Sequence, residues 1–260
     1  MSLEVLPLVE ICRDGAVGIV SLNRPDRRNA LDLPMRSAIA GAIRELDGDA
    51  DIRAIVVTGA PGIFAAGADL NLLVDKGAQQ VADINLGQYW APLRACTKPV
   101  VAAISGPALG AGCELAMMCD ILVAERGARL GQPEARVGIM PGAGGTQRLV
   151  RAVGKAVASM VLFGGETLSG ERAYQLGLVS ELVEDGQSLL RALELAHVAA
   201  RLPPKAVRAI KRVLAQGADL PLDAALALEN REFLLLFDTA DKTEGMRAFL
   251  EKRSPDFTGS

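Results

Sequence analysis

The sequence predicts an α/β fold, because short runs rich in β-branched residues alternate with helical or glycine-rich segments in its first half. The predicted strands cover residues 17–22, 54–59, 99–105 and 120–124. After Gly145 the pattern changes, and helical segments follow one another to the C-terminus. The 260 residues suffice for one sizeable domain with a large core.

The helical segments can be placed from their start and stop signals. The first begins at Asp32 and Pro34 and ends near Gly48, with apolar residues at helical spacing: Ile39, Ile43 and Leu46. The later helices are predicted over residues 145–153, 155–163, 169–176, 186–201, 204–216, 221–237 and 241–253. Because Leu202-Pro203-Pro204 interrupts the pattern, we expect a core over residues 1–200 and a helical C-terminal subdomain over 201–260.

Charge and hydropathy exclude several classes of partner. The net charge is −3, and acidic and basic residues are interspersed, so we expect no nucleic-acid ligand. The longest apolar stretch, residues 100–124, contains Pro107, Glu114 and Asp120, and therefore predicts no transmembrane helix. The N-terminal residues lack the basic start and apolar centre of a secretory signal. We expect a cytoplasmic protein without a membrane partner.

The cysteines and the single histidine disfavour several catalytic classes. No CxxC motif and no neighbouring histidine accompanies the four cysteines, so we expect reduced core thiols at Cys12, Cys96, Cys113 and Cys119. His197 lies in a helical pattern and is expected to pack on a buried face with Leu189, Leu190, Leu193 and Ala200. Without a GxSxG motif, a serine hydrolase is disfavoured, and the dinucleotide and Walker motifs are incomplete.

Three glycine-rich loops are the strongest local signals for a ligand site. They cover residues 64–70, 106–114 and 140–148, and each is expected to lead into a helix. The first NH groups of a helix have no intrahelical partner, and small residues let a ligand oxygen approach them. Two such helix starts could form an oxyanion hole. Tight turns that only permit close packing remain the alternative for each loop.

Two glutamates accompany these loops. Glu114 interrupts the apolar run ALGAGCELAMMCDILVA, where an unpaired carboxylate would be costly to bury. Glu134 follows twenty residues later, directly after Pro133, and alone would also fit an ordinary first-turn helix residue. Addition or removal of water requires one group that takes a proton and another that gives one, and two glutamates can do both without histidine or metal. Apolar surroundings raise a carboxyl pKa, whereas a helix N-terminus and nearby amides oppose that shift.

Several long motifs resemble the enoyl-CoA hydratase/isomerase, or crotonase, family. They are NRPDRRNAL at 23–31, FAAGADL at 64–70, KPVVAAISGPALGAGCELAMMCDILVA at 98–124, GQPEARVGIMPGAGGTQRL at 131–149 and EGMRAFLEKRSPDF at 244–257. They stand in the family's order and span nearly the whole chain. The resemblance implies a crotonase-type spiral of ββα units followed by a helical trimerisation region, and hence a homotrimer or a dimer of trimers.

The resemblance also implies roles for individual residues. Glu114 and Glu134 would be the catalytic carboxylates, and the NH groups of Ala68 and Ala111 the oxyanion hole. Contacts with substrate or CoA would come from Arg24, Ala30, Leu31, Ala66, Asp69, Leu70, Pro133 and Gly142, and more weakly from Lys242 and Phe249. The acyl pocket would be lined by residues 71–95 with Pro107 and Met140. Coenzyme A is then part of the substrate, and neither a metal nor a redox cofactor is needed.

The function implied by this resemblance is hydration of a 2-enoyl-CoA to a 3-hydroxyacyl-CoA, in fatty-acid or aromatic-acid degradation. A Δ3-Δ2-enoyl-CoA isomerase, which needs only one acid-base carboxylate, and a non-catalytic RNA-binding homologue remain alternatives. The segment FAAGADLN, Trp90 and the ending EKRSPDF are similar to the 2,3-dehydroadipyl-CoA hydratase branch of phenylacetate breakdown. A substrate with a terminal carboxylate calls for a cation in the acyl pocket. Arg94 is a candidate, although it also fits an ordinary helix-surface residue.

Overall fold

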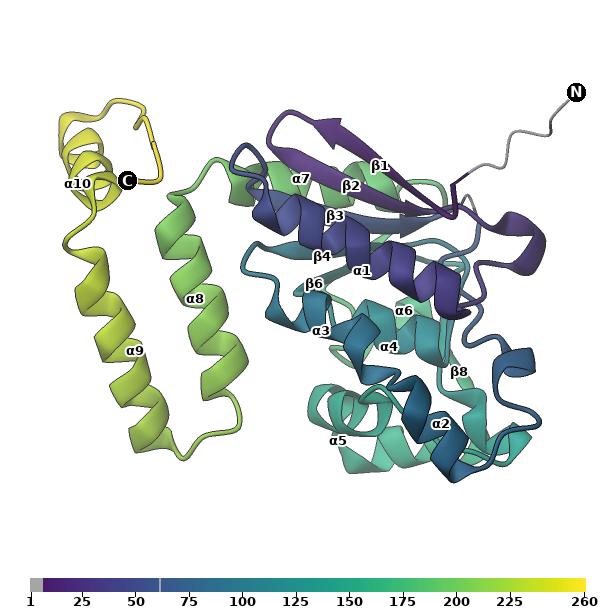
Figure 1. The fold of residues 1–260 in the computed structure, drawn as a ribbon. Coiled ribbons are helices and arrows are strands. Elements are labelled where there is room, and N and C mark those ends of the chain that lie inside the picture. The colour runs from purple at the N-terminus through teal and green to yellow at the C-terminus, as the bar shows by residue number, and fades with distance from the viewer. Residues whose placement is uncertain (1–6, 61) are drawn as a thin grey trace, which may run out of the picture.

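The centre of the fold is a six-stranded, mostly parallel sheet, shown in Figure 1. The computed structural model describes residues 7–60 and 62–260. The strand order is β1-β2-β3-β4-β6-β9, in which only β1 and β2 pair in antiparallel fashion. The strands are β1 (Val9–Asp14), β2 (Val17–Leu22), β3 (Ala54–Gly59), β4 (Val100–Ile104), β6 (Ile121–Glu125) and β9 (Glu181–Val183). The four predicted strands are therefore confirmed to within one residue at each end.

A second, three-stranded sheet lies beside the first and was not predicted. It comprises β5 (Pro107–Leu109), β7 (Arg129–Gly131) and β8 (Thr167–Ser169), in the order β5-β7-β8. These strands have only three residues each, too few for a recognisable hydrophobic period. Because β5 follows β4 directly and α4 (Ala111–Met117) follows β5, the chain forms a ββα unit here. A second such step runs through β6, β7 and the 3-10 helix η3 (Pro133–Val137).

Helices cover both faces of the large sheet. On one face, α1 (Leu33–Gly48) and α3 (Gly87–Ala95) pack against each other, and α7 (Ser188–Ala200) lies behind the sheet in Figure 1. The predicted α1 is confirmed: the Asp32 side chain accepts a hydrogen bond from Met35 N at 2.9 Å and caps the helix. Its apolar face is buried among the residues of the main core, as expected for Ile39, Ile43 and Leu46.

The prediction for the buried face of α7 is wrong for two leucines. Leu189 and Leu190 are exposed, and the buried positions follow a four-residue spacing instead: Ser188, Ala192, Ala196 and Ala200. Small side chains at this spacing let the helix approach the sheet closely, whereas leucines would hold it away. His197 lies beside this face, where its Nε2 is 2.9 Å from Asp14 Oδ2, so it makes a polar contact and not the expected packing contact.

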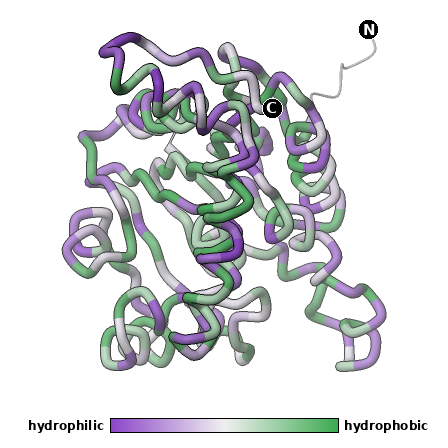
Figure 2. The backbone as a smooth tube through the Cα atoms, turned by 90° about the vertical axis from the view of Figure 1, so that its left-hand side faces the viewer, coloured by the Kyte–Doolittle hydropathy of each residue, from purple (hydrophilic) through white to green (hydrophobic). Residues whose placement is uncertain are grey.

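The second half is largely helical, as predicted. The two helices expected at 145–153 and 155–163 are confirmed: they make up α5 (Gly145–Gly164) and are separated by a kink at Gly154, whose φ of 75° is non-helical. The other elements before residue 200 are η1 (Pro25–Arg27), η2 (Leu70–Leu72), α2 (Ala78–Ile84) and α6 (Gly170–Gln175). Figure 2 shows that hydrophobic and hydrophilic residues alternate along most helices, as expected for elements with one buried face.

Three C-terminal helices extend away from the sheets. These are α8 (Pro204–Gly217), α9 (Leu222–Leu236) and α10 (Ala240–Glu251), and α8 and α9 lie side by side in Figure 1. The C-terminal tail returns to α10, where the buried Asp241 accepts hydrogen bonds from Thr258 N and Gly259 N at 2.8 and 2.9 Å. Within residues 7–60 and 62–260, no helix is long and apolar enough to cross a membrane.

The cysteine prediction holds for three of the four residues. Cys96, Cys113 and Cys119 are buried and free, and burial raises the pKa of the Cys96 thiol to about 11 and that of Cys113 to about 12. Such thiols are protonated and inert at neutral pH. Cys12 is exposed, so its predicted core position is wrong. It lies on β1, an edge strand whose alternate residues face outward.

The cap of α1 can be tested by substitution. We expect Asp32→Ala to lower the free energy of unfolding by about 1 kcal/mol, because it removes both the N-cap and the ion pair with Arg24. Urea denaturation followed by circular dichroism measures this. Asp26→Ala is the control, because Asp26 is exposed and its ion pair with Arg27 is long, at 3.9 Å. This substitution should change the free energy of unfolding by less than about 0.5 kcal/mol. Equal effects of the two substitutions would contradict the capping role.

Candidate active site

One cavity brings together both predicted carboxylates and both predicted oxyanion donors. Its volume is about 300 Å³, and Glu114, Glu134, Ala68, Ala111 and Gly142 all line it. The rest of its wall is formed by Arg36, Leu73, Lys76, Val81, Leu86, Trp90, Ile139, Met140 and Ala143. A larger cavity of about 550 Å³ lies elsewhere and contains none of the predicted site residues. The predicted acyl wall from residues 71–95 and Met140 thus faces the carboxylates, whereas Pro107 lies outside the cavity.

Glu114 is held by the third glycine-rich loop. The side chain is only 2% exposed, and its Oε1 accepts hydrogen bonds from Ala143 N at 2.7 Å and from Gly145 N at 2.8 Å. These two amides lie just before and at the start of α5. They replace part of the hydration that the carboxylate loses on burial. Backbone donors from a distant loop therefore compensate a charge that lies inside an apolar run.

Glu134 faces the same cavity from η3, and it is less tightly held. Burial, together with the negative charge of Glu114, raises its pKa to about 7. Its carboxyl group lies against Gly110, where a Cβ would come within 2.7 Å of Oε1, and the positive φ of 50° at this position also favours glycine. The amide nitrogen of the buried Gln132 lies 3.2 Å from both carboxyl oxygens once the amide is oriented to satisfy its contacts. Glu134 is thus a carboxyl group that can exist in either protonation state near neutral pH.

The NH groups of Ala68 and Ala111 are available to a ligand. In the part of the chain that the structure describes, neither donates a hydrogen bond to a backbone or side-chain acceptor. Their loops are fixed to each other, since Ala65 N donates to Pro107 O and Leu109 N donates to Ala65 O, both at 3.0 Å. This pairing is possible because residue 112 is glycine: a Cβ there would lie 2.3 Å from Ala65 O. Two free donors on rigid loops can stabilise a developing oxyanion.

The comparisons with known proteins agree with this arrangement. Residues 13–260 match the family model described as enoyl-CoA hydratase/isomerase. The chain belongs to that family. It is 45% identical to the 2,3-dehydroadipyl-CoA hydratase of Escherichia coli, over 96% of this chain and 98% of that protein. It is also 37% identical to the short-chain-enoyl-CoA hydratase of Clostridium acetobutylicum, over 93% of this chain and 94% of that protein.

Solved structures of the enoyl-CoA hydratase/isomerase family confirm the predicted fold. An enoyl-CoA hydratase subunit from Geobacillus kaustophilus superimposes with a TM-score of 0.95 at 40% sequence identity, covering 97% of this chain and 98% of that one. An enoyl-CoA hydratase from Bacillus anthracis gives a TM-score of 0.93 at 33% identity, covering 97% and 100%. The α/β crotonase-type fold expected from the sequence motifs is therefore the fold of this chain.

The predicted CoA-contact residues near the N-terminus lie beside the 64–70 loop, which carries Ala68, and two hydrogen bonds join that loop to residues 28–31. Leu31 N donates to Gly67 O at 2.8 Å, and Ala66 N donates to Arg28 O at 3.0 Å. Leu31 is fully buried, and Arg24 forms an ion pair with Asp32 at 2.6 Å while it also donates to Ala30 O. In this family member, these residues make contacts within the chain, and their contact with CoA stays a prediction.

The remaining predicted contact residues lie around the cavity or far from it. Asp69 caps η2, Leu70 is exposed at the start of that helix, and Pro133 directly precedes Glu134. The first loop therefore leads into a helix, as expected, and this helix is a 3-10 helix of three residues. Lys242 lies over the Phe237 ring in the C-terminal helices, and Phe249 is exposed there, so neither lines the site cavity.

Sequence analysis missed Arg36, which lies at the wall of this cavity. It occupies α1 at helical spacing from Ile39, Ala40 and Ile43, and this spacing places it on the buried face of the helix. An arginine at such a position was a signal that could have been recognised. Arg94, the cation considered from the sequence, is exposed on α3 and lies outside the cavity.

The raised pKa of Glu134 is testable without substrate. We expect its carboxyl group to titrate at about 7 and to be mostly protonated below that pH. Glu114→Gln removes a negative charge and should lower the Glu134 pKa. That pKa should nevertheless stay above the ordinary 4.5, because burial is the larger cause of the shift. Difference infrared spectra of the carboxyl band measure both values, and loss of the band in Glu134→Gln assigns it. A wild-type band that titrates near 4.5 would contradict the assignment.

Proposed function

We propose that this protein is an enoyl-CoA hydratase that adds water to a 2-enoyl-CoA thioester and forms a 3-hydroxyacyl-CoA. The observation that carries the proposal is the pair Glu114 and Glu134 in one cavity with two unoccupied NH donors. The relatives whose names specify hydration of enoyl-CoA esters support it. The proposed chemistry uses carboxylates and backbone amides only, and independence of metal and redox cofactors stays a prediction.

The first role of the site is polarisation of the thioester. The carbonyl oxygen would accept hydrogen bonds from Ala68 N and Ala111 N, which favour the negative charge that develops on it. Because the double bond is conjugated with that carbonyl, carbon 3 becomes electrophilic. Each donor of this kind contributes about 3–4 kcal/mol to transition-state stabilisation in enzymes where one has been removed.

The second role is proton transfer to and from water. A water molecule between the two carboxyl groups attacks carbon 3 and gives a proton to Glu114, whose Oε1 is already fixed by two amides. Glu134, with a pKa of about 7, supplies a proton to carbon 2. The sum of these steps adds one water across the double bond. Transfer of the proton from Glu114 to Glu134 then restores the starting state. Positioned proton transfer contributes about 10²- to 10⁴-fold in rate.

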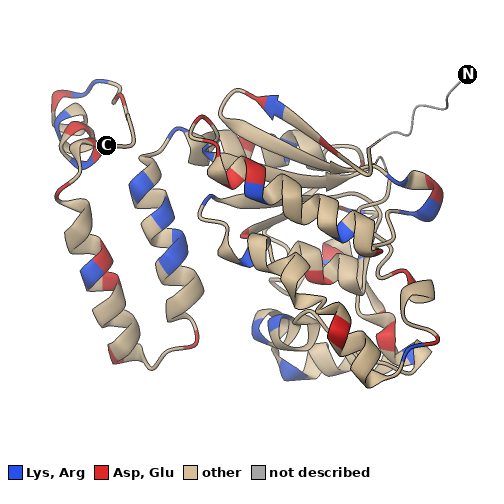
Figure 3. Cartoon of the chain, viewed as in Figure 1, with Lys and Arg blue, Asp and Glu red and all other residues tan. Residues whose placement is uncertain are grey.

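Both rival functions are less well supported by the chain. A Δ3-Δ2-enoyl-CoA isomerase needs a single acid-base group, whereas two carboxyl groups face this cavity. Figure 3 shows acidic and basic residues interspersed over most elements, whereas the charged residues of α8 are all basic. On α8, the most basic helix, Lys211 pairs with Asp120 and Arg212 pairs with Glu232. This favours an enzyme over an RNA-binding homologue.

We also propose that residues 201–260 form a trimerisation subdomain. Helices α8, α9 and α10 expose large apolar side chains that a monomer would leave in water: Ile210, Leu214, Leu222, Phe233, Leu234, Phe249 and Leu250. Such an apolar surface is typical of an interface between subunits. A second copy of the chain is the proposed partner, in a homotrimer or a dimer of trimers. Cytoplasmic location also stays a prediction.

Glutamine variants test the two-carboxylate mechanism. We expect Glu114→Gln and Glu134→Gln each to lower kcat for crotonyl-CoA by about 10²-fold or more, because each removes one proton-transfer group. The double variant should lose less than the product of the two single effects, since the groups act as a unit. Activity should also fall as the pH rises through about 7, where Glu134 loses its proton. Loss of the enoyl-thioester absorbance measures these rates.

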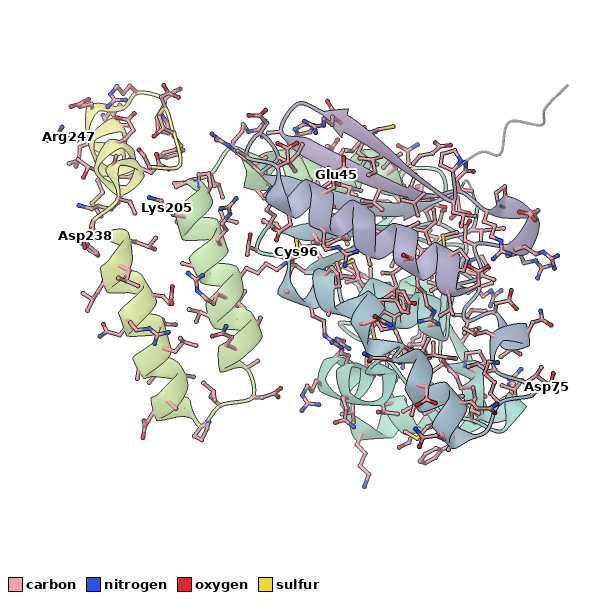
Figure 4. The ribbon with its side chains drawn as sticks, in the orientation of Figure 1. Glu45, Asp75, Cys96, Lys205, Asp238 and Arg247 are labelled. Atoms are coloured by element: carbon pink, nitrogen blue, oxygen red, sulfur yellow. The ribbon has the colours of Figure 1, made fainter. Side chains whose placement is uncertain are left out.

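Glu45→Gln is the matched control for these variants. Glu45 is exposed on α1, outside the cavity, as labelled in Figure 4, and its substitution should leave kcat within about 2-fold. A wild-type protein that isomerises 3-enoyl-CoA but adds no water to any 2-enoyl-CoA would overturn the proposal in favour of the isomerase. Full activity of either glutamine variant would overturn the mechanism.

The proposed assembly can be measured independently of activity. Sedimentation equilibrium should give three or six times the chain mass of 27.2 kDa. Leu250 is 79% exposed, and Leu250→Glu should shift the distribution toward monomers if α10 contributes to the interface. Val74→Glu is the control, because Val74 is 73% exposed but lies outside residues 201–260. A monomeric wild-type protein at micromolar concentration would contradict the proposal.

A further inference from the structure

Arg36 is a buried cation whose side chain borders the site cavity. Only 3% of the residue is exposed, although arginine is rarely buried without a partner. Its Nε donates to Leu31 O at 3.0 Å, and its Cζ lies 4.9 Å from the centre of the Trp90 ring. The guanidinium is thus fixed on two sides, by a backbone carbonyl and by an aromatic face, and is presented at the cavity wall.

The two terminal nitrogens of Arg36 have no acceptor among the described residues. Neither makes a hydrogen bond, and no carboxylate oxygen lies within ion-pair distance of them, although the charges of Glu114 and Asp32 act on Arg36 from farther away. Burial lowers the pKa of Arg36, but a guanidinium remains protonated in proteins. A buried, protonated group that uses one of its five donors is costly unless a ligand supplies further acceptors.

Trp90 packs its ring beside Arg36 and contributes to the same wall. Its indole Nε1 is buried away from the cavity and makes no hydrogen bond with any residue that the structure describes. Trp90 lines the same cavity, together with the apolar side chains of Leu73, Val81 and Leu86. This part of the wall therefore combines an apolar lining with the terminal nitrogens of Arg36, a pattern that suits a chain of carbon atoms ending in an anionic oxygen group.

We propose that Arg36, held against the Trp90 ring, forms a subsite for a carboxylate at the far end of the acyl group and so selects enoyl-CoA esters of dicarboxylic acids. The inference rests on the proposed function, because the reacting carbons must lie between Glu114 and Glu134. Arg36 shares the cavity wall with Leu73, Val81, Leu86 and Trp90, which belong to the segment 71–95 that is expected to line the acyl pocket. The proposal therefore places the acyl end of the substrate, and not the nucleotide of CoA, beside Arg36. A guanidinium binds a carboxylate with two parallel hydrogen bonds, which gives both affinity and geometric selectivity.

Saturated esters test the subsite without turnover. Adipyl-CoA and hexanoyl-CoA have six acyl carbons and differ in the terminal carboxylate, and isothermal titration calorimetry gives Kd for each. We expect the wild-type protein to bind adipyl-CoA at least about 10-fold more tightly, and Arg36→Leu to reverse that preference. Arg94→Leu is the matched control, because Arg94 is an exposed arginine on the helix that carries Trp90, and it should change the Kd ratio less than about 3-fold.

The possible results distinguish a carboxylate subsite at Arg36 from a purely structural role of Arg36 and from the proposed hydratase activity. Equal Kd values for the two esters in the wild-type protein would overturn it, even if Arg36→Leu does not fold. If Arg36→Leu raises the Kd of both esters by the same factor, the inference is also overturned, because Arg36 then only maintains the structure of the cavity. If the protein hydrates crotonyl-CoA but binds adipyl-CoA and hexanoyl-CoA equally, the proposed function stands and the subsite is refuted. If the protein prefers adipyl-CoA but hydrates no 2-enoyl-CoA, the subsite stands and the proposed function is refuted.

Discussion

The geometry of the site depends on the pair of hydrogen bonds that Glu114 accepts from Ala143 N and Gly145 N. They join two segments that are thirty residues apart in sequence, the N-terminal turn of α4 and the loop that leads into α5. Without these donors, a carboxylate that is almost fully buried would lose its hydration uncompensated, at a cost of several kcal/mol. The same contact places the 140–148 loop, and hence Met140, Gly142 and Ala143, at the cavity wall. The hydrogen bonds that the buried Glu114 carboxylate needs therefore also determine the shape of the cavity.

A second constraint fixes the two segments that carry the proposed oxyanion donors relative to each other. The short pairing of Ala65 with residues 107–109 fixes the 64–70 loop to the strand that leads into α4. Gly112 permits this contact because a larger residue would collide with Ala65 O. The donors at residues 68 and 111 therefore lie on segments that cannot move independently. Preorganisation of this kind is what makes backbone amides effective in transition-state stabilisation, because no reorganisation is needed when the charge develops.

The sequence allowed the strands, the helices and the two glutamates to be predicted because each has a local signal. Buried strands show as apolar runs, helices as periodic patterns, and Glu114 as a charge inside an apolar segment. The partners of Glu114 had no such signal, since a backbone amide has the same chemical identity at every non-proline residue. The buried face of α7 was assigned wrongly because alanines, not leucines, pack against the sheet there. Arg36 was missed although its spacing placed it on the buried face of α1, because arginine is usually assigned to the surface.

The charge of Glu114 couples the groups that face the cavity. While Glu114 is ionised, it contributes to the raised pKa of Glu134 and also favours the charged form of Arg36. In the proposed mechanism Glu114 accepts a proton from water, so that negative charge disappears and the pKa of Glu134 falls. The acid therefore becomes stronger at the moment when carbon 2 requires a proton, and the two transfers assist each other. A single base paired with a neutral partner would lack this coupling, which is a physical reason for hydration to use two carboxyl groups in one low-dielectric cavity.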